Sequence, residues 1–346
     1  MSRQRSGGSK AGSANLRKVA EIAGVSTATV SRAMNSPELV SPELRERIAS
    51  VVNRLGWVPH GVARALATRR TGAIGAVFPT LTHGDFARAI EALQRELTRL
   101  GYTLLLACSE YDAAQEFQQV RKFVERGVDA ILLVGAEHHH DLKGFLNLNR
   151  VPVLNMFVYA PETDGTSIGP DNHKALYRMT NYLIGLGHRR FGVIAQDSLT
   201  NDRARARNQG IRDALAEHGL AVRPDHFVIG QWTIHEGREL FRQIVSHDPK
   251  PTAVICGNGY LAVGALLESQ AMGIRVPAEM SIVGYDDIEI MAELPISITT
   301  VRVQSDEVGR RAALHIVSRV EGLENPPEFE CDTEIVVRAS SGPPPA

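Results

Sequence analysis

Two groups of residues in this 346-residue sequence have the types and positions needed to bind other molecules. The first is the segment 16–35, LRKVAEIAGVSTATVSRAMN, where short polar side chains and Arg32 follow a glycine turn. A helix that begins with such side chains fits the major groove of DNA, where its first residues reach base edges. The second group consists of polar residues that follow apolar runs later in the chain. Open parallel sheets bind small ligands at such strand ends.

The region around the first group predicts three short helices. Asn15, Ser26 and Ser41 are placed to cap them, and Pro42 suits the first position of the third helix. Gly24 joins the first two helices by a tight turn. Three short helices connected in this way outline a helix-turn-helix domain. The alternative is a generic three-helix bundle with a solvated polar face.

The charge of the chain is distributed unevenly, although its formal net charge is only -1. Residues 1–70 carry twelve basic and four acidic side chains, a net charge of +8, which leaves −9 on the remainder. Such asymmetry is typical of an anion-binding segment attached to an ordinary globular body. The basic excess favours DNA binding over the generic bundle.

Composition excludes several classes of protein. The hydrophobic content of 43% is enough for a sizeable core. No apolar stretch approaches the ~18 residues of a membrane helix, and the first fourteen residues contain no apolar signal-peptide region. Cys108, Cys256 and Cys331 lack paired Cys-x-x-Cys spacing, so we expect neither a disulfide framework nor a zinc finger. We expect the protein to work in the reducing cytoplasm.

No cofactor or metal site is expected. The glycines at 72 and 75 precede a predicted strand, whereas a phosphate-binding loop must follow one. The run His138-His139-His140-Asp141 invites a metal interpretation. Consecutive histidines on one short segment cannot all converge on one ion, and no Cys or Glu is spaced to help them. We therefore predict a solvated loop there.

After about residue 72, apolar runs alternate with amphipathic helical stretches, which indicates parallel sheets covered on both faces. This much sequence exceeds one sheet and predicts two α/β lobes. The expected strands lie in 74–79, 102–108, 129–135, 151–158, 191–196, 252–258 and 281–287.

The segment 16–35 resembles the headpiece of the lactose/galactose-repressor (LacI/GalR) family of bacterial transcription regulators, whose pattern is close to V-A-x-x-A-G-V-S-x-x-T-V-S-R. The similarity continues through SPELRERI, LGWVP, the ARAL linker, VGYDD and TTVRV, and so covers about residues 15–340. The resemblance implies a ligand-responsive repressor, not an enzyme, that binds a palindromic DNA operator as a homodimer in the cytoplasm. It also implies a body of the two-lobed periplasmic-binding-protein type.

The expected organisation follows from this resemblance. It comprises a flexible tail (1–14), the helix-turn-helix domain (15–59), a hinge linker (60–71), the effector-binding body (72–340) and a short tail (341–346). Within the body, the first lobe is expected at about 72–167 and 297–327, and the second at about 168–296 and 328–340.

The resemblance also implies which residues meet DNA. Thr27 and Ala28 would read bases, and Arg32 would contact a base or the backbone. Leu66 would wedge into the minor groove at the operator centre, although the linker could instead be a plain connector packed lightly on the body. The expected DNA-contacting set is Lys18, Ser26, Thr27, Ala28, Thr29, Ser31, Arg32, Asn35 and Leu66.

For the effector, the resemblance implies contacts from Arg207, Asn258 and Asp286, which can share hydrogen bonds with vicinal hydroxyls or an anion. Trp232 would pack on the ligand ring, and Phe86 would close the other side. Each has an alternative. The aspartate could cap the next helix, the asparagine could form only a turn, and the tryptophan could be a half-buried core residue.

The charge of the effector stays open between a sugar, a sugar acid and a phosphorylated sugar. Arg203, Arg205 and Arg207 fan over different faces of one helix, so some of them are expected to face solvent. If two reach the cleft, an acidic or phosphorylated effector fits better than a neutral one.

A second class of function is a stand-alone binding protein or an α/β enzyme with a basic N-terminal extension. A transport-type binder needs an export signal, which the N-terminal residues do not resemble. An enzyme needs a nucleophile or general base in the cleft, and Asp286 is the only visible candidate.

Overall fold

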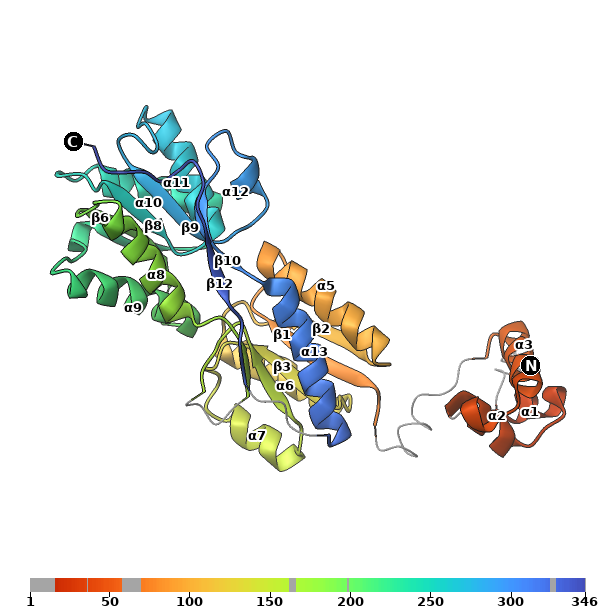
Figure 1. Ribbon diagram of the computed structural model, residues 1–346. Helices are drawn as coiled ribbons and strands as arrows, with labels where there is room; N and C mark the ends of the chain where they lie inside the picture. Colours follow the sequence, from red (N-terminus) through yellow and green to blue (C-terminus); the bar gives the residue numbers. More distant parts are fainter. Residues whose placement is uncertain are drawn as a thin grey trace, which may run out of the picture. The chain divides into compact units, whose positions relative to one another are not determined.

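The computed structural model describes residues 16–35, 37–57, 70–161, 166–197, 199–323 and 328–345. The chain divides into two compact units, residues 1–71 and 72–346 (Figure 1). The expected tail 1–14, the cap Asn15 and most of the linker, including Leu66, lie outside the described residues. Among the helices that are described, none is long and apolar enough to cross a membrane.

The first unit contains the predicted short helices. They are α1 (Leu16–Ala23), α2 (Thr27–Asn35), the 3-10 helix η1 (Pro37–Leu39) and α3 (Pro42–Leu55). Val19, Val30, Ile48 and Trp57 are buried together at their centre. Ser26 caps α2 through its Oγ, which accepts a hydrogen bond from the Thr29 N–H at 3.1 Å. These contacts make the helix-turn-helix a small packed domain.

One predicted cap of this unit is wrong. Ser41 precedes α3, but its side chain makes no capping hydrogen bond. Pro42 at the first helical position lacks an N–H to satisfy, which leaves less for a cap to do. At the other end Gly56 adopts the left-handed conformation, with φ 57°, that ends the helix.

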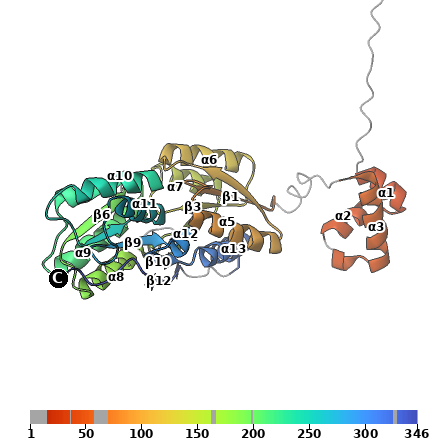
Figure 2. The same cartoon turned by 90° about the horizontal axis from the view of Figure 1, so that it is seen from above.

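The second unit contains two sheets flanked by helices (Figures 1 and 2). The first lobe has the strand order β11-β5-β4-β3-β1-β2 with all pairs parallel. Its strands are β1 (Ala73–Phe78), β2 (Thr103–Cys108), β3 (Ala130–Val134), β4 (Val153–Met156), β5 (Ser167–Gly169) and β11 (Phe329–Glu330). Its helices are α5 (Gly84–Arg99), α6 (Ala113–Glu125), α7 (Leu142–Asn149) and α13 (Ser305–Glu321).

The second lobe repeats this plan with the strand order β12-β10-β9-β8-β6-β7. Its strands are β6 (Phe191–Gln196), β7 (Phe227–Gly230), β8 (Ala253–Cys256), β9 (Ser281–Asp286), β10 (Thr299–Val303) and β12 (Thr333–Val336). Its helices are α8 (Asn172–Gly185), α9 (Asp202–Glu217), the 3-10 helix η2 (Pro224–His226), α10 (Ile234–Val245), α11 (Gly259–Ala271) and α12 (Ile290–Glu293). β12 runs antiparallel to β10, so this sheet is not purely parallel.

Side-chain alternation along the strands gives each sheet two apolar faces. On β1, Ile74 and Phe78 face the core formed with α5 and α13, whereas Val77 faces the core formed with α6 and α7. In the second lobe, Ile255 of β8 faces α8 and α9, and Cys256 faces α10 and α11. Both sheets are therefore covered on both sides, which explains the near-continuous apolar runs of the sequence.

Strand pairing corrects the expected lobe boundaries. β10 pairs with β9 and β12, so residues 299–303 belong to the second lobe and not to a first-lobe segment 297–327. β5 pairs with β4, and β11 pairs with β5, so both belong to the first lobe. The expected boundaries were drawn along the chain, and these short strands have no apolar run that would reveal their partners.

Glycine allows the close approach of the paired helices in each lobe. A Cβ on Gly309 of α13 would overlap the carbonyl oxygen of Ala89 in α5. Gly210 of α9 is in the same position against His173 of α8, and Gly264 of α11 against Ile234 of α10. Backbone atoms cannot yield as a flexible side chain can, so these positions set the distance between the helices.

We expect Gly309→Ala to lower the free energy of unfolding by about 1–3 kcal/mol, because α13 must move away from α5. The control is Gly144→Ala in α7, where no heavy atom lies within 4 Å of the added Cβ. There alanine is expected to be neutral or stabilising by up to about 1 kcal/mol. Urea unfolding of both variants tests this, and equal midpoints would contradict the close-approach argument.

Candidate functional site

The exposed face of α2 carries the residues expected to meet DNA. Val30 and Ala33 of α2 are buried, whereas Thr27, Ala28 and Arg32 are exposed. Among the other expected residues, Lys18 and Ser26 are exposed, and Thr29 and Ser31 are half-buried. The side chain of Asn35 and the whole of Leu66 lie outside the described residues. The arrangement presents short polar groups and a cation on one side of a helix, which suits base edges and phosphates.

A cavity of about 40 Å³ lies where the strand ends of both sheets of the second unit meet. Phe86 and Asp85 reach it from the start of α5, Arg207 from α9, and Asp286 from the end of β9. Its complete lining is His83, Asp85, Phe86, Tyr111, Phe157, Pro170, Asn172, Gln196, Asn201, Arg203, Arg207, Tyr285, Asp286 and Val303. We call this space the inner cavity.

Two of the three alternating arginines reach the inner cavity. Arg203 and Arg207 stand one helical turn apart on α9 and are 6% and 7% exposed. Arg205 points outward and pairs with Glu137. Arg205 is therefore the one of the three that faces solvent, which confirms the expectation that some of them would.

Arg207 is held by neutral groups. Its guanidinium donates to Asn172 Oδ1 and to Gln196 Oε1, both at 2.8 Å, and lies 4.6 Å from the centre of the Tyr285 ring. Its Nε is buried without a hydrogen-bond partner. Arg203, in contrast, donates to Asp202 at 3.0 Å. The cavity thus contains one ion-paired guanidinium and one that only neutral groups hold.

Asp286 pairs with a residue that the sequence did not suggest. Its Oδ2 lies 3.4 Å from His83 Nε2 and 3.4 Å from the Gly259 N–H. Burial opposes ionisation of this carboxyl, but His83 and Arg207 hold its pKa below the ordinary value. Burial likewise opposes charging of His83, yet Asp286 raises the pKa of that imidazole. The pair joins the first lobe to the second.

Asp85 is buried beside this pair. Burial, with the charge of Asp286 added, raises the pKa of Asp85 to about 8 in spite of its contact with Arg88. Its Oδ2 has no hydrogen-bond partner. Burial therefore favours the protonated form of Asp85 in the folded protein more than in an exposed aspartic acid.

Trp232 and Asn258 do not line the inner cavity. Trp232 lines an adjoining outer cavity of about 800 Å³ and makes edge contacts with the rings of His83 and Tyr260. Asn258 caps α11 through its Oδ1, which accepts from the Leu261 N–H at 2.9 Å, while its Nδ2 is buried without a partner. Asn258 therefore acts as a helix cap, a role that differs from the turn considered as its alternative.

Asp286 does not cap the next helix. The residue before α12 is Glu289, which makes no side-chain cap, and Asp287 bonds to Arg302 at 2.7 Å. The helix-capping alternative for these aspartates is wrong. The structure brings together Phe86, Arg207 and Asp286 of the five expected effector contacts.

Strained backbone surrounds the cleft. Tyr111, Phe157 and Asp286 have φ values of 62°, 62° and 85°, which non-glycine residues rarely adopt. Each follows or ends a strand whose carboxyl end faces the inner cavity. Such strain persists where the surroundings enforce it, often at functional sites.

Residues that the sequence did not indicate include His83, Asp85, Asn172, Gln196 and Tyr285. A signal existed for two of them, since Gln196 ends the run FGVIAQ and Tyr285 lies within VGYDD. No sequence pattern indicates that the first-lobe residues His83 and Asp85 lie against the second lobe.

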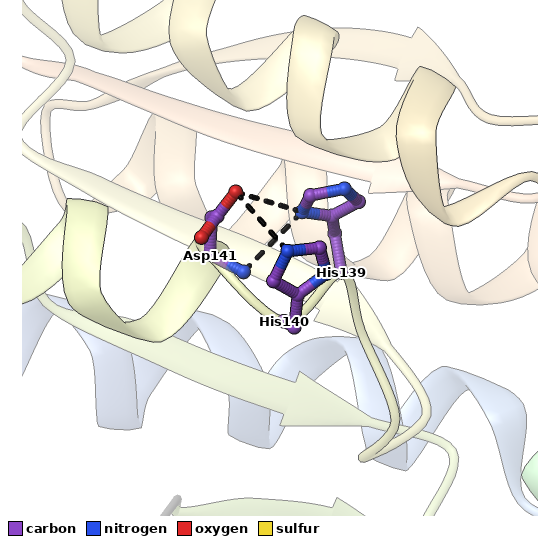
Figure 3. A group of neighbouring side chains, drawn as sticks. All are labelled: His139, His140 and Asp141. Carbon is purple, nitrogen blue, oxygen red and sulfur yellow. Dashed lines mark hydrogen bonds and ion pairs between the residues drawn. The ribbon is translucent and has the colours of Figure 1, made fainter.

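The histidine run 138–140 is only partly a solvated loop. His138 is half-buried and bonds to Glu116 at 2.8 Å and to Asn155 at 3.1 Å. His139, His140 and Asp141 each turn one potential metal-ligand atom toward the others, and these atoms lie within 4.8 Å of one another (Figure 3). The three histidines do not all converge, and Glu116, which the spacing did not reveal, lies beside His138.

Comparison with known proteins agrees with both units. Residues 15–60 match the model for bacterial regulatory proteins of the lacI family, and residues 180–341 match a periplasmic binding protein-like domain. The HTH-type transcriptional repressor PurR of Pasteurella multocida is 32% identical over 330 residues, which is 94% of this chain and 98% of the relative. The repressor CytR of Escherichia coli K12 is 29% identical, covering 95% and 96% of the two chains.

Solved structures agree in fold. The transcriptional regulator CelR in complex with cellobiose has a TM-score of 0.70 at 26% identity, with coverage of 94% of this chain and 99% of that one. The Lac repressor dimer bound to operator and the anti-inducer ONPF has a TM-score of 0.85 at 24% identity, with coverage of 95% and 99%.

Fold and cleft together define a two-lobed small-molecule sensor whose chain also contains a helix-turn-helix domain. The chain belongs to the LacI family of ligand-responsive, DNA-binding transcriptional repressors.

The protons held by Asp85 and His83 predict that stability falls with rising pH. A group whose pKa is raised by folding contributes stability below its unfolded value and loses it as the pH passes the folded value. The stabilising contribution of Asp85 is lost as the pH rises to about 8, its pKa in the folded protein. The contribution of His83 is lost at pH values above 6.5, the ordinary pKa of histidine. The free energy of unfolding should fall by up to about 1.4 kcal/mol per pH unit for each extra proton held.

Asp85→Asn should reduce this slope because the amide cannot titrate. Thermal unfolding of wild type and variant between pH 6 and 8 measures the effect. Parallel curves for the two proteins would show that Asp85 does not hold its proton.

Proposed function

We propose that this chain is a homodimeric repressor in which a small anionic effector, bound between the lobes, changes the affinity for a palindromic operator. The observation that carries the effector class is the buried guanidinium of Arg207. Within the described residues, no carboxylate lies within 4.0 Å of it, and its contacts are amides and an aromatic ring. The negative charge that acts on it, that of Asp286, is already paired with His83. A buried guanidinium without an ion pair of its own is costly, and a ligand carboxylate or phosphate would complement it in bidentate fashion.

Arg203 adds to this preference. It borders the same cavity, and its partner Asp202 also accepts a hydrogen bond from the Ala136 N–H of the first lobe at 2.7 Å. Asp202 is therefore shared between Arg203 and the other lobe. Because of this sharing, it does not fully neutralise the positive charge that Arg203 presents to the cavity. Two arginines on one wall favour a sugar acid or a phosphorylated sugar over a neutral sugar.

The DNA-binding part of the proposal rests on α2. Its exposed Thr27, Ala28 and Arg32 form the surface that would enter the major groove, with Lys18 of α1 near the phosphates. Effector and operator then influence each other reciprocally, whichever sign the coupling has. A protein that acts on the chromosome in this way works in the cytoplasm.

Arg32→Ala tests the DNA-binding half. We expect it to weaken binding to a fragment selected by the wild-type protein by about 10- to 100-fold, the worth of a base or phosphate contact. Gel shift at physiological salt measures this. Arg95→Ala, which removes an exposed arginine of α5 from the second unit, is the control and should bind normally. Selective binding that survives deletion of residues 1–70 would refute the assignment.

Arg207→Gln tests the effector half. A thermal-shift screen of sugars, sugar acids and sugar phosphates supplies the ligand, and calorimetry then compares variants. We expect Arg207→Gln to weaken binding by ~1.5–3 kcal/mol, as for the loss of a charged hydrogen bond. Arg205→Gln, two residues away on the outer face of α9, should leave affinity unchanged. A screen in which only neutral sugars bind would contradict the anionic class.

A further inference from the structure

His83 packs against the part of the second lobe that contains a buried carboxylate and two aromatic rings. It lies in the first lobe, between β1 and α5, and is 6% exposed. Its ring centre lies 5.6 Å from that of Trp232 and 5.3 Å from that of Tyr260, both second-lobe residues. Its Nε2 faces Asp286 Oδ2. The imidazole thus makes the contacts that a sugar ring and its hydroxyls would otherwise seek there.

Neighbouring contacts hold the His83 segment against the second lobe. The Tyr260 hydroxyl donates to the carbonyl oxygen of Thr82 at 3.3 Å. Arg88 donates to the carbonyl oxygen of Asp286 at 3.2 Å. A ligand that displaced His83 would have to break these contacts as well as the ion pair. The imidazole is therefore an integral part of the cleft wall.

With His83 in place, the groups left for a ligand are mostly hydrogen-bond donors. His83 Nδ1 and Arg207 Nε are both buried at the inner cavity without partners. Asp85 Oδ2 is a third unpartnered atom there, on a carboxyl whose pKa is raised by burial. The two unpartnered nitrogens around one small space complement an anion, whereas a neutral sugar needs acceptors as well.

The sizes of the two cavities agree with a small anion-binding space beside a larger space for the rest of a ligand. The inner cavity of about 40 Å³ is far smaller than the ~300–1,000 Å³ of typical small-molecule sites. The outer cavity shares Tyr111, Gln196 and Asn201 with it, and so offers the adjoining space for the rest of a ligand. Trp232 borders the outer cavity and not the inner one, and its ring contacts His83, which lines the inner cavity.

We propose that His83 is the specificity-determining residue of the cleft. Its imidazole fills the binding positions beside Asp286 and Trp232, so an effector can bind only on the side of the cleft that is lined by arginine. Such an effector must carry a carboxylate or phosphate. This inference rests on the proposed function as a ligand-responsive repressor. It changes the role expected for Asp286, which holds His83 and does not bind the effector directly.

Calorimetry on the full chain tests the proposal with four probes: D-glucose, D-glucuronate, D-gluconate and D-glucose 6-phosphate. The wild type should bind at least one anionic probe and bind glucose at least tenfold more weakly. The comparison of the sugar acids with the phosphate ester identifies which anion is preferred. His83→Ala should lower the ratio of anion affinity to glucose affinity by at least tenfold, because it frees Asp286 and Trp232 and removes one donor.

His235→Ala, which removes an exposed histidine of α10, is the matched control and should keep the wild-type ratio. Circular dichroism checks that each variant folds. If His83→Ala does not fold, His83→Gln carries the test. It keeps one N–H group toward Asp286 and should retain a preference for anions, with weaker anion binding because the Nδ1 donor is lost.

Two failures are distinguishable. An anion-selective wild type whose ratio His83→Ala leaves unchanged, or a His83→Gln variant that binds anions as the wild type does, overturns the role of His83 alone. A wild type that binds none of the anions at 10 mM, or binds glucose equally well, overturns this inference together with the proposed effector class. The gel shift with Arg32→Ala reports on DNA binding independently of both.

Discussion

The ion pair between His83 and Asp286 is the contact on which the cleft depends. A buried carboxylate is tolerated where it has a partner and hydrogen bonds, and Asp286 obtains both from His83 and the Gly259 N–H. Because the imidazole comes from the first lobe and the carboxylate from the second, the interaction that satisfies the charge also determines how the lobes meet. Removing either group would leave the other buried and unpaired, and the adjacent Arg88 and Tyr260 contacts would lose their support.

The path of the chain restricts how the lobes can move. Within the described residues, the chain crosses between β5 and α8, between β10 and α13, and between β11 and β12. Three neighbouring connections allow a hinge rotation more easily than a separation or a slide. Opening of the cleft therefore moves the His83 segment away from Asp286 as a unit with α5. A ligand anion held by Arg207 would act on the same rotation from the second lobe.

The sequence predicted the strands that form apolar runs and missed the very short strands and those that contain several polar residues. β1, β3, β6 and β8 appear as apolar runs because helices cover both sides of them. β10 contains Thr299, Thr300 and Arg302, so no apolar run marks it, and only pairing with β9 places it. Arg207 and Asp286 could be located from strand ends and the family pattern. His83 could not, since its role arises from contact between lobes that no local pattern encodes.

The same segment also has a direct covalent connection to the linker. The chain enters the second unit at Gly72, whose N–H is fixed by Asp129 Oδ2 at 2.7 Å, and continues as β1 toward His83. β1 is an interior strand paired with β2 and β3, so it transmits displacement with little deformation of its own. A ligand that changes the position of His83 therefore acts on the strand that begins where the linker ends. Regulation of DNA binding needs a two-state element that both ligands bias, and a rotation of the first lobe, which contains β1, would be such an element.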